Sequence, residues 1–239
     1  MNYFFITGSS KGLGKALSEL LLTDTNNMVY GFARTNTIAH KNYIHTTIDF
    51  SNLNQVSAYQ FPQLKNAERI TLVNNAGIVG DIKYVGNIDN QKIIDCYNIN
   101  TIAPAIFTNN FMNLYSDKSI EKLILNVSSG AGRSPIDGWN IYCSSKAALD
   151  MLSQVINEEN KIDNNNCTAL SLAPGIIDTE MQVTIRSADQ SNFSNIKNFI
   201  SYKKEGDLSN PKNTAIQVLQ FINNPKLATS TLCSVRDLS

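Results

Sequence analysis

The sequence predicts an α/β protein in which helices cover both faces of a parallel sheet. Apolar runs of strand length alternate along the chain with longer stretches whose apolar residues recur at helical spacing, an alternation typical of βαβ units. Several of the runs are apolar at every position, as expected for strands covered on both faces. The 239 residues suffice for one such domain with a sizeable core, so we expect a single domain over residues 1–239.

Each expected element follows from its own pattern of apolar residues. The strands are expected at Tyr3–Ile6, Met28–Ala33, Tyr43–Thr47, Arg69–Asn74, Lys122–Val127, Thr168–Leu172 and Ser230–Val235. The helices are expected at Gly12–Leu22, Asn54–Gln60, Gln91–Tyr115, Trp139–Glu159 and Pro211–Ile222. Residues 178–210 form a long polar insertion with scattered apolar positions, and we expect a pair of short helices there that serves as a substrate lid.

Composition excludes several classes of function. The chain carries 20 basic and 20 acidic side chains with a formal net charge of +0, so it offers no electrostatic field for a nucleic acid or an anionic membrane surface. Its apolar stretches are shorter than the roughly 20 residues that cross a bilayer, and the apolar stretch at the N-terminus is too short for a signal peptide. We therefore expect a cytoplasmic protein.

The cysteines and histidines do not have the spacing of a structural site. No two cysteines form a CxxC pair, so neither a disulfide framework nor a zinc site is expected, and we interpret the cysteines as reduced thiols that pack in the interior. The residues concerned are Cys96, Cys143, Cys167, Cys233, His40 and His45.

A glycine-rich turn follows the first expected strand and begins the first expected helix. It reads Thr7-Gly8-Ser9-Ser10-Lys11-Gly12-Leu13-Gly14. Free backbone N–H groups and the helix dipole at such a place hold a pyrophosphate, and the glycines permit a tight turn and a close approach of the cofactor. The position of the turn predicts a dinucleotide-binding, Rossmann-type sheet of about seven strands.

The residues after the second expected strand bear on the choice of cofactor. An acidic side chain there would accept a hydrogen bond from the ribose 2′-hydroxyl of NAD, whereas a cation would pair with the 2′-phosphate of NADP. Arg34 occupies this place, and Lys11 in the glycine turn is a second cation for the same phosphate. NADPH/NADP⁺ is therefore the expected cofactor; the alternative is that both side chains are solvated surface cations.

A second constellation combines Ser129, Tyr142 and Lys146. Tyr142 and Lys146 are four residues apart, so they share one face of the expected helix. A neighbouring ammonium group lowers the pKa of a tyrosine, so we expect Tyr142 to exchange protons near neutral pH. Ser129 ends the fifth expected strand, at the edge where open α/β sheets bind ligands, and its hydroxyl is placed to hydrogen-bond a substrate oxygen.

Taken together, these motifs resemble the short-chain dehydrogenase/reductase family. The glycine turn, Asn74-Asn75-Ala76-Gly77, Asn100, Ser129, Tyr142-Cys143-Ser144-Ser145-Lys146 and Pro174-Gly175 occur in the family's order and span nearly the whole chain. The resemblance implies an NADP-dependent oxidoreductase that acts on carbonyl or CH–OH groups, with Tyr142 as general acid, Ser129 polarising the carbonyl, and Lys146 binding the nicotinamide ribose. It also implies a homo-oligomer, because family members are usually dimers or tetramers.

The resemblance assigns further residues by their match to the family's motifs. Asn100 corresponds to the asparagine that holds a water for proton relay; the alternative is a buried amide that satisfies helix backbone, and both roles are compatible, while Asn98 competes for the same place. Asp49 would contact adenine unless it is only an exposed turn residue, and Thr179 would meet the nicotinamide carboxamide unless it caps a helix. The implied cofactor-binding residues are Gly8, Ser10, Lys11, Gly12, Leu13, Arg34, Asp49, Asn75, Ala76, Gly77, Tyr142, Lys146, Pro174, Gly175, Ile177 and Thr179.

The segments around the expected site are most similar to the sepiapterin-reductase-like branch, and within it to the microbial benzil reductases. These segments are 128–132, 138–143, 173–182 and 185–186. The similarity implies reduction of one carbonyl of a vicinal diketone, as from benzil to (S)-benzoin. The substrate would contact Ser129 and Tyr142, and Trp139 and Met181, with Ile136 and Ile185, would supply apolar walls unless they are core residues.

The C-terminus departs from the family pattern. Many members end in a glycine-rich strand with an Asp-Gly-Gly element, and animal sepiapterin reductases anchor the pterin by an aspartate near the C-terminus. Here Asp237 is the carboxylate of the last ten residues, and it is displaced from that place. We therefore prefer a diketone substrate, with a sepiapterin or pteridine reductase and a non-catalytic NADP sensor as the alternatives.

Overall fold

The computed structural model describes residues 1–238 and contains one parallel sheet. The strand order is β3-β2-β1-β4-β5-β6-β7, which confirms the predicted doubly wound fold. The strands are β1 Asn2–Thr7, β2 Asn27–Ala33, β3 Tyr43–Thr47, β4 Arg69–Asn74, β5 Glu121–Val127, β6 Cys167–Ala173 and β7 Leu232–Ser234. The chain winds outward from β1 to β3, then returns to β4 beside β1 and winds the other way, and ligands bind at such a switch point.

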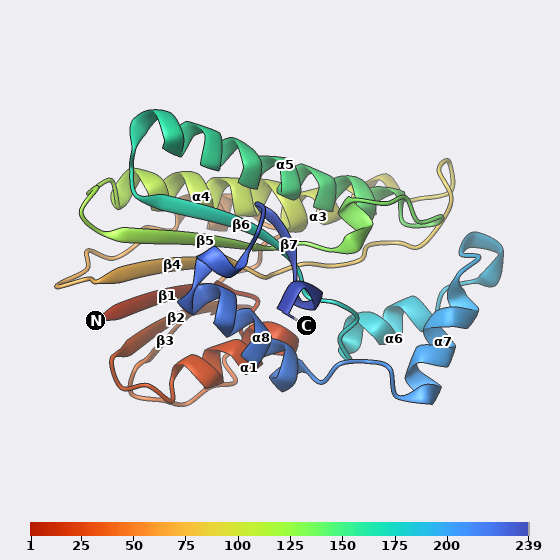
Figure 1. The fold of residues 1–239 in the computed structure, drawn as a ribbon. Helices are drawn as coiled ribbons and strands as arrows, with labels where there is room; N and C mark the ends of the chain where they lie inside the picture. Colours follow the sequence, from red (N-terminus) through yellow and green to blue (C-terminus); the bar gives the residue numbers. More distant parts are fainter. Residues whose placement is uncertain (239) are drawn as a thin grey trace.

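Helices form a layer on each face of the sheet (Figure 1). Helices α3, α4 and α5 lie on one face, and α1 and α8 lie on the other, whereas α6 and α7 lie beyond the carboxyl ends of the strands. The helices are α1 Gly12–Leu21, α2 Leu53–Ala58, α3 Asn90–Tyr97, α4 Ala103–Leu114, α5 Asn140–Asp163, α6 Glu180–Arg186, α7 Ile196–Glu205 and α8 Pro211–Asn223. No helix within residues 1–238 is both long enough and apolar enough to cross a membrane.

Alternate residues of the strands build two separate cores. On β1, Phe4 and Ile6 pack with α1 and α8 residues, whereas Tyr3 and Phe5 belong to the core on the other face. The second core is rich in aromatic rings, and the Phe5 ring lies 4.8 Å from that of Tyr30, centroid to centroid. Burial of both alternations explains why the strands read as continuous apolar runs.

The single helix predicted at Gln91–Tyr115 is instead three segments. A π-helical turn, Asn98–Ile102, separates α3 from α4, and within it the Ala103 N–H donates to the Asn98 carbonyl. Pro104 has no N–H to donate to the carbonyl of Asn100 one turn earlier, so regular α-helical bonding is interrupted at this place. Apolar periodicity alone does not reveal such an interruption.

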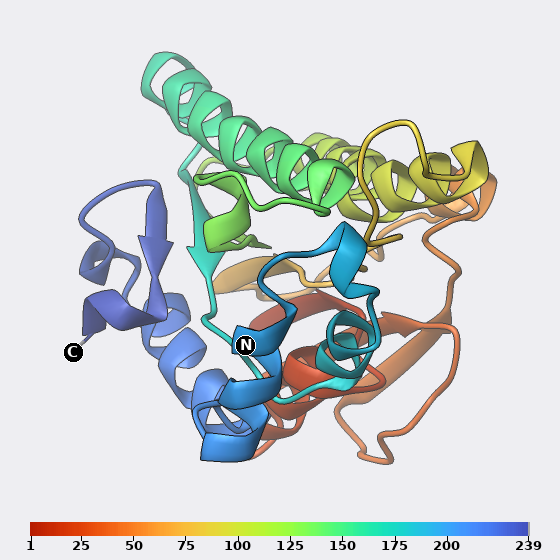
Figure 2. The ribbon, with the colours of Figure 1, turned by 90° about the vertical axis from the view of Figure 1, so that its right-hand side faces the viewer.

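Residues 178–210 contain the two predicted short helices, α6 and α7, beyond the carboxyl edge of the sheet (Figure 2). The two ends of the segment lie together, because Ile177 and Ser209 form an isolated parallel bridge and the Asp178 N–H donates to the Ser209 carbonyl at 2.9 Å. The segment is therefore a compact excursion that leaves and rejoins the domain at one point.

Candidate active site

A cleft of about 1130 Å³ lies at the carboxyl edge of the sheet, between the glycine turn, the loops after β4, β5 and β6, and helix α6. The sequence-predicted site residues that line it are Gly8, Ser10, Lys11, Gly12, Leu13, Arg34, Asp49, Asn75, Ala76, Gly77, Ser129, Trp139, Tyr142, Lys146, Pro174, Gly175, Ile177, Thr179 and Met181. Asn100 does not line it and lies behind the wall formed by Gly77. The structure thus brings residues that are far apart in sequence to one cavity.

Tyr142 and Lys146 lie one turn apart on α5, and both are almost fully buried. The Lys146 Nζ lies 5.8 Å from the centroid of the Tyr142 ring and donates a 2.8 Å hydrogen bond to the Val127 carbonyl at the end of β5. This hydrogen bond was not expected from the sequence. It joins Lys146 on α5 to Val127 on β5, two elements that the motif does not relate.

Burial, rather than the ammonium charge, dominates the protonation of Tyr142. Removal from water raises the pKa of Tyr142 to about 12, and the hydrogen bond with the Ser129 side chain only partly opposes this. The expectation that Tyr142 has a lowered pKa is therefore wrong, because burial outweighs the effect of the neighbouring ammonium group. Burial also lowers the pKa of Lys146 to about 8. Both groups are thus driven toward their neutral forms, since a buried charge is costly.

Ser129 follows β5 and begins a short turn, Gly130–Gly132, that lies against α5. Its Oγ accepts a 3.2 Å hydrogen bond from the Ala131 N–H, and its carbonyl accepts one from the Gly132 N–H at 3.0 Å. The turn holds Ser129 beside Tyr142 at the edge of the sheet. A hydroxyl, a phenol and an ammonium group therefore converge on one wall of the cleft.

The side chain of Asn100 is held by protein partners on both its oxygen and its nitrogen. Its Oδ1 accepts from the Ile78 N–H at 2.9 Å, and its Nδ2 donates to the Ile78 carbonyl at 2.8 Å and to the Ser145 Oγ at 3.0 Å. Asn100 therefore fixes the loop after β4 against α5, and its part in a proton relay stays a prediction. Asn98 donates to the Ser51 carbonyl at 3.1 Å and does not line the cleft.

The glycine turn has the backbone that a dinucleotide requires. Gly8 and Gly12 have φ angles of +70° and +55°, which side chains rarely adopt. The Asn75 Nδ2 donates to the Thr7 carbonyl at 2.9 Å, and the Thr7 Oγ1 accepts from the backbone N–H groups of Asn75 and Ala76. Asn75 thus connects the loop after β4 to the glycine turn by hydrogen bonds and holds the turn in its open conformation.

The two predicted phosphate-binding cations differ in their surroundings. Arg34 is exposed at the end of β2 and lies near Asp49, whose pKa it helps to hold below the usual range, although hydrogen bonds from Ser51 contribute more. Lys11 instead pairs with Glu180 at the start of α6. The sequence offered no sign of this ion pair, because its partners are 169 residues apart.

Thr179 occupies the N-cap position of α6, as the capping alternative has it, but its side chain makes no capping hydrogen bond. Its methyl group packs against the glycine turn, 3.3 Å from the place where a side chain at Gly12 would begin. A side chain at position 12 would therefore be in tight contact with Thr179 and would also be strained by the φ angle of +55°.

The inner end of the cleft is apolar. Trp139 lies edge-on to Tyr142, with ring centroids 5.4 Å apart, and stacks on Phe193 from the 178–210 segment. Met181 and Ile185 of α6 pack in the same cluster. Trp139 and Met181 are thus both wall residues of the cleft and members of a packed cluster. Phe199, which also lines the cleft, was not predicted from the sequence.

Segment 178–210 is fastened to the loop before α5. The Asp137 carboxylate accepts from the Ser194 N–H at 2.8 Å and from the Ser194 Oγ at 2.9 Å, which lowers the pKa of Asp137. A side chain at Gly138 would begin 2.3 Å from the Asn192 carbonyl oxygen, so the two backbones are in close contact. The apolar end of the cleft is covered by these contacts.

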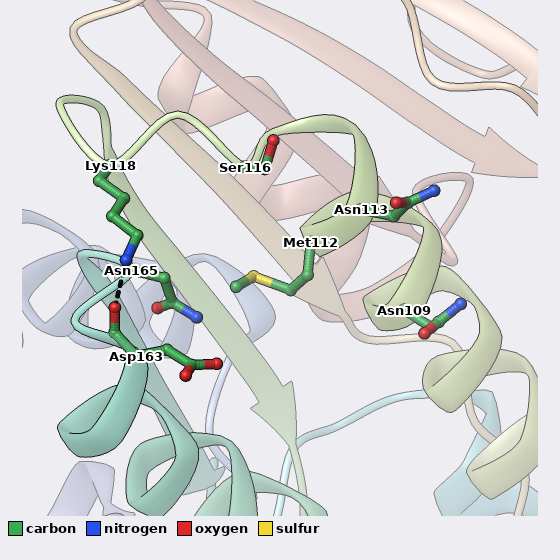
Figure 3. A pocket seen from close by; sticks show the side chains of 7 residues that line it. All are labelled: Asn109, Met112, Asn113, Ser116, Lys118, Asp163 and Asn165. Atoms are coloured by element: carbon green, nitrogen blue, oxygen red, sulfur yellow. Dashed lines mark hydrogen bonds between the residues drawn. The ribbon is translucent and has the colours of Figure 1, made fainter.

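A second hollow, of about 390 Å³, lies on the opposite edge of the sheet (Figure 3). It is lined by Asn109, Met112, Asn113, Ser116, Lys118, Asp163 and Asn165. Lys118 donates to the backbone carbonyl of Asp163. Ser129, Tyr142 and Lys146 all line the larger cleft, so the chemistry is assigned to that cleft.

Comparison with known proteins agrees with this geometry. The family model described as short chain dehydrogenase matches residues 2–190. The chain belongs to the short-chain dehydrogenase family. It is accordingly an NAD(P)-dependent oxidoreductase, and the resemblance noted in the sequence is confirmed. No cluster of metal-binding side chains occurs within residues 1–238, and all four cysteines are free.

Curated relatives include benzil reductases and sepiapterin reductases. A benzil reductase ((S)-benzoin forming) of Bacillus subtilis is 34% identical over 229 residues, which cover 93% of each chain. A sepiapterin reductase of Xenopus tropicalis is 29% identical over 224 residues, 84% of this chain and 82% of the relative. A short chain dehydrogenase/reductase structure from Saccharomyces cerevisiae has a TM-score of 0.84 at 22% identity and covers 98% of this chain and 96% of its own, which supports the fold.

Proposed function

We propose that the protein is an NADPH-dependent carbonyl reductase that reduces one carbonyl of a vicinal diketone. The observation that carries this proposal is the convergence of Ser129, Tyr142 and Lys146 at the mouth of a covered apolar compartment. Similarity to the benzil reductases supports the diketone as the substrate class.

In this function, Tyr142 donates the proton and Ser129 orients the carbonyl. The phenol is protonated across the neutral range because burial raises its pKa to about 12, so it is available as an acid. The Ser129 hydroxyl donates to the same carbonyl oxygen and stabilises the charge that develops on it. The bound nicotinamide supplies the hydride. Lys146 binds the nicotinamide ribose and, while charged, favours loss of the proton from Tyr142.

The cofactor fits the residues present. The positive φ angles of Gly8 and Gly12 leave a cradle without side chains, and a side chain at Gly77 would begin 3.4 Å from the Lys146 Nζ. Backbone N–H groups at the start of α1 would hold the pyrophosphate, and Asp49 would lie at the adenine end. Pro174, Gly175, Ile177 and Thr179 would flank the nicotinamide.

Arg34 is proposed to select NADPH over NADH through the 2′-phosphate. Its replacement by Ala is expected to raise the KM for NADPH by roughly 10- to 100-fold and to leave the KM for NADH nearly unchanged. Steady-state kinetics with both cofactors measure the ratio. A matched control is Arg236→Ala, which removes an arginine at the β7 side of the cleft. Equal losses with both cofactors for Arg34→Ala would contradict the assignment.

The rate of reduction is expected to fall in alkaline solution. Tyr142 stays protonated below pH 12, whereas Lys146, with a pKa of about 8, loses its charge as the pH rises through that value. The kcat for reduction should therefore be level below pH 8 and decline above it. A profile of kcat against pH measures this, and in Lys146→Arg the decline should move to higher pH because the guanidinium stays charged. An unchanged profile in that variant would assign the decline to another group.

The apolar cluster favours a diketone with flat rings over a pterin. Trp139, Phe199 and Met181 offer surfaces for an aromatic ring. Asp237, the aspartate near the C-terminus, accepts a hydrogen bond from the Ser234 N–H at 2.7 Å and is absent from the lining of the cleft. The Asp237 carboxylate therefore does not provide an anchor for a pterin.

We further propose that residues 1–239 form one domain in which the 178–210 segment acts as a substrate lid. We also propose that the protein is cytoplasmic and forms a homo-oligomer. Met151 and Val155 on α5 are exposed apolar side chains, with exposed fractions of 58% and 43%, and are candidates for contact with a second copy. Sedimentation equilibrium measures the assembly, and Met151→Glu should dissociate it.

Turnover of benzil tests the function. Oxidation of NADPH by the purified protein is expected with benzil, at a much lower rate with NADH, and with little or no rate for sepiapterin. Chiral chromatography of the benzoin then reports the stereochemistry. Faster reduction of sepiapterin would favour the pteridine reductase, and tight NADPH binding without turnover of either compound would favour the sensor.

A further inference from the structure

An ion pair beside the catalytic residues joins the buried Asp150 to Arg133, which is exposed and lines the cleft. Asp150 is 4% exposed and lies on α5, one turn beyond Lys146. Its Oδ2 lies 3.3 Å from the Nε of Arg133, the residue that follows the Ser129 turn. Its Oδ1 accepts a 2.5 Å hydrogen bond from the Ser171 hydroxyl on β6. A carboxylate so deeply buried is costly unless it is paired, and here both of its oxygens have partners.

Arg133 joins this carboxylate to two strands. Its guanidinium donates through one nitrogen to the Ser171 carbonyl at 3.0 Å and to the Cys233 carbonyl of β7 at 3.2 Å. The Arg133 N–H also donates to the Gly130 carbonyl at 3.0 Å. The side chain that pairs with Asp150 therefore closes the turn that begins at Ser129.

The Ser129 turn is packed against the backbone of α5 at Lys146 itself. A side chain at Gly132 would begin 2.9 Å from the Lys146 carbonyl carbon and 3.1 Å from the Asp150 Oδ2. Because of this close contact, the turn and the helix cannot move closer together. The Arg133–Asp150 ion pair joins them and thereby fixes their spacing.

Asp150 is also the carboxylate that lies one turn from Lys146 on α5. The other titratable groups that face the ammonium are the Tyr142 phenol and the Cys96 thiol of α3, whose pKa burial raises to about 11. Both are neutral near pH 7. Burial lowers the pKa of Lys146, and Cys96 and, to a smaller extent, Asp150 raise it against this effect.

From this geometry we infer that Asp150 and Arg133 are positioning residues for the reaction: Arg133 fixes the Ser129 hydroxyl relative to Tyr142, and Asp150 holds Arg133 in place and puts a carboxylate one turn from Lys146 on α5. The inference rests on the proposed function for its effect on turnover, but the protonation of Lys146 is independent of any substrate. Neither residue follows from the sequence motifs, which end at Lys146.

The test separates these two roles by two variants. Asp150→Asn keeps the shape and removes the charge, so the pKa of Lys146 should fall by about one unit, and the alkaline decline of kcat should move by the same amount. Arg133→Lys keeps the charge but loses the branched donor, so kcat should fall by about tenfold with an unchanged pKa of Lys146 and an unchanged substrate KM. The pKa is read from NMR titration of ¹³C-lysine-labelled protein, assigned with Lys146→Arg.

The matched control is Glu121→Gln, which removes a carboxylate from the ion pair with Arg69 at the other end of β5. It should lower the Tm without moving the Lys146 pKa or kcat. If Asp150→Asn does not fold, Asp150→Ser removes the same charge. A lower Tm with an unchanged Lys146 pKa in these variants would reduce Asp150 to a structural residue. A wild-type protein without turnover would contradict the proposed function, and the NMR titration would still decide the effect of Asp150.

Discussion

Tyr142→Phe is expected to lower kcat for carbonyl reduction by about a thousandfold, because the variant has no proton to donate to the developing alkoxide. The ring remains, so its edge-on contact with Trp139 and the buried surface are retained. The dissociation constant for NADPH should change by less than about threefold. Single-turnover kinetics and fluorescence quenching by NADPH measure the two quantities.

Tyr97→Phe is the control for the loss of a hydroxyl. The Tyr97 hydroxyl hydrogen-bonds the Ser144 Oγ at 2.7 Å, next to the catalytic segment of α5, but Tyr97 does not line the cleft. Its kcat should remain near that of the wild type. Retention of a tenth or more of the wild-type kcat by Tyr142→Phe would show that another group supplies the proton.

Gly14→Ala is expected to weaken NADPH binding by about 100-fold or to prevent folding altogether. A methyl group there would lie 2.4 Å from the Gly8 carbonyl oxygen and 2.4 Å from the Asn75 Nδ2. The first neighbour is backbone of the glycine turn, so the turn itself must move, at a cost of about 1–3 kcal/mol in unfolding free energy. Calorimetric titration with NADPH and thermal unfolding measure both effects.

Gly86→Ala is the matched control, because position 86 has open space around it and a φ angle of +96°. It should cost about 1 kcal/mol in backbone strain and leave NADPH affinity unchanged. Normal NADPH affinity in Gly14→Ala would mean that the glycine turn tolerates displacement, and the assignment of the pyrophosphate to this turn would be wrong.

Local sequence patterns are sufficient to predict much of the fold and of the site of this protein. Strand and helix positions follow from apolar periodicity, and the seven strands lie within a few residues of their predicted bounds. The glycine turn, Ser129 and the Tyr142–Lys146 pair were predicted to lie on the same cleft, because each follows a strand or shares a helix face.

Only the tertiary structure decided the protonation and the partners of these residues. The pKa of Tyr142 is raised rather than lowered, because burial is a property of the whole fold and outweighs a neighbouring charge that the motif does reveal. The Lys11–Glu180 pair and the Arg133–Asp150 pair join segments that no local pattern relates. Local sequence specifies backbone geometry through short-range sterics and periodicity, whereas charge pairing and desolvation depend on which distant segments the fold brings together.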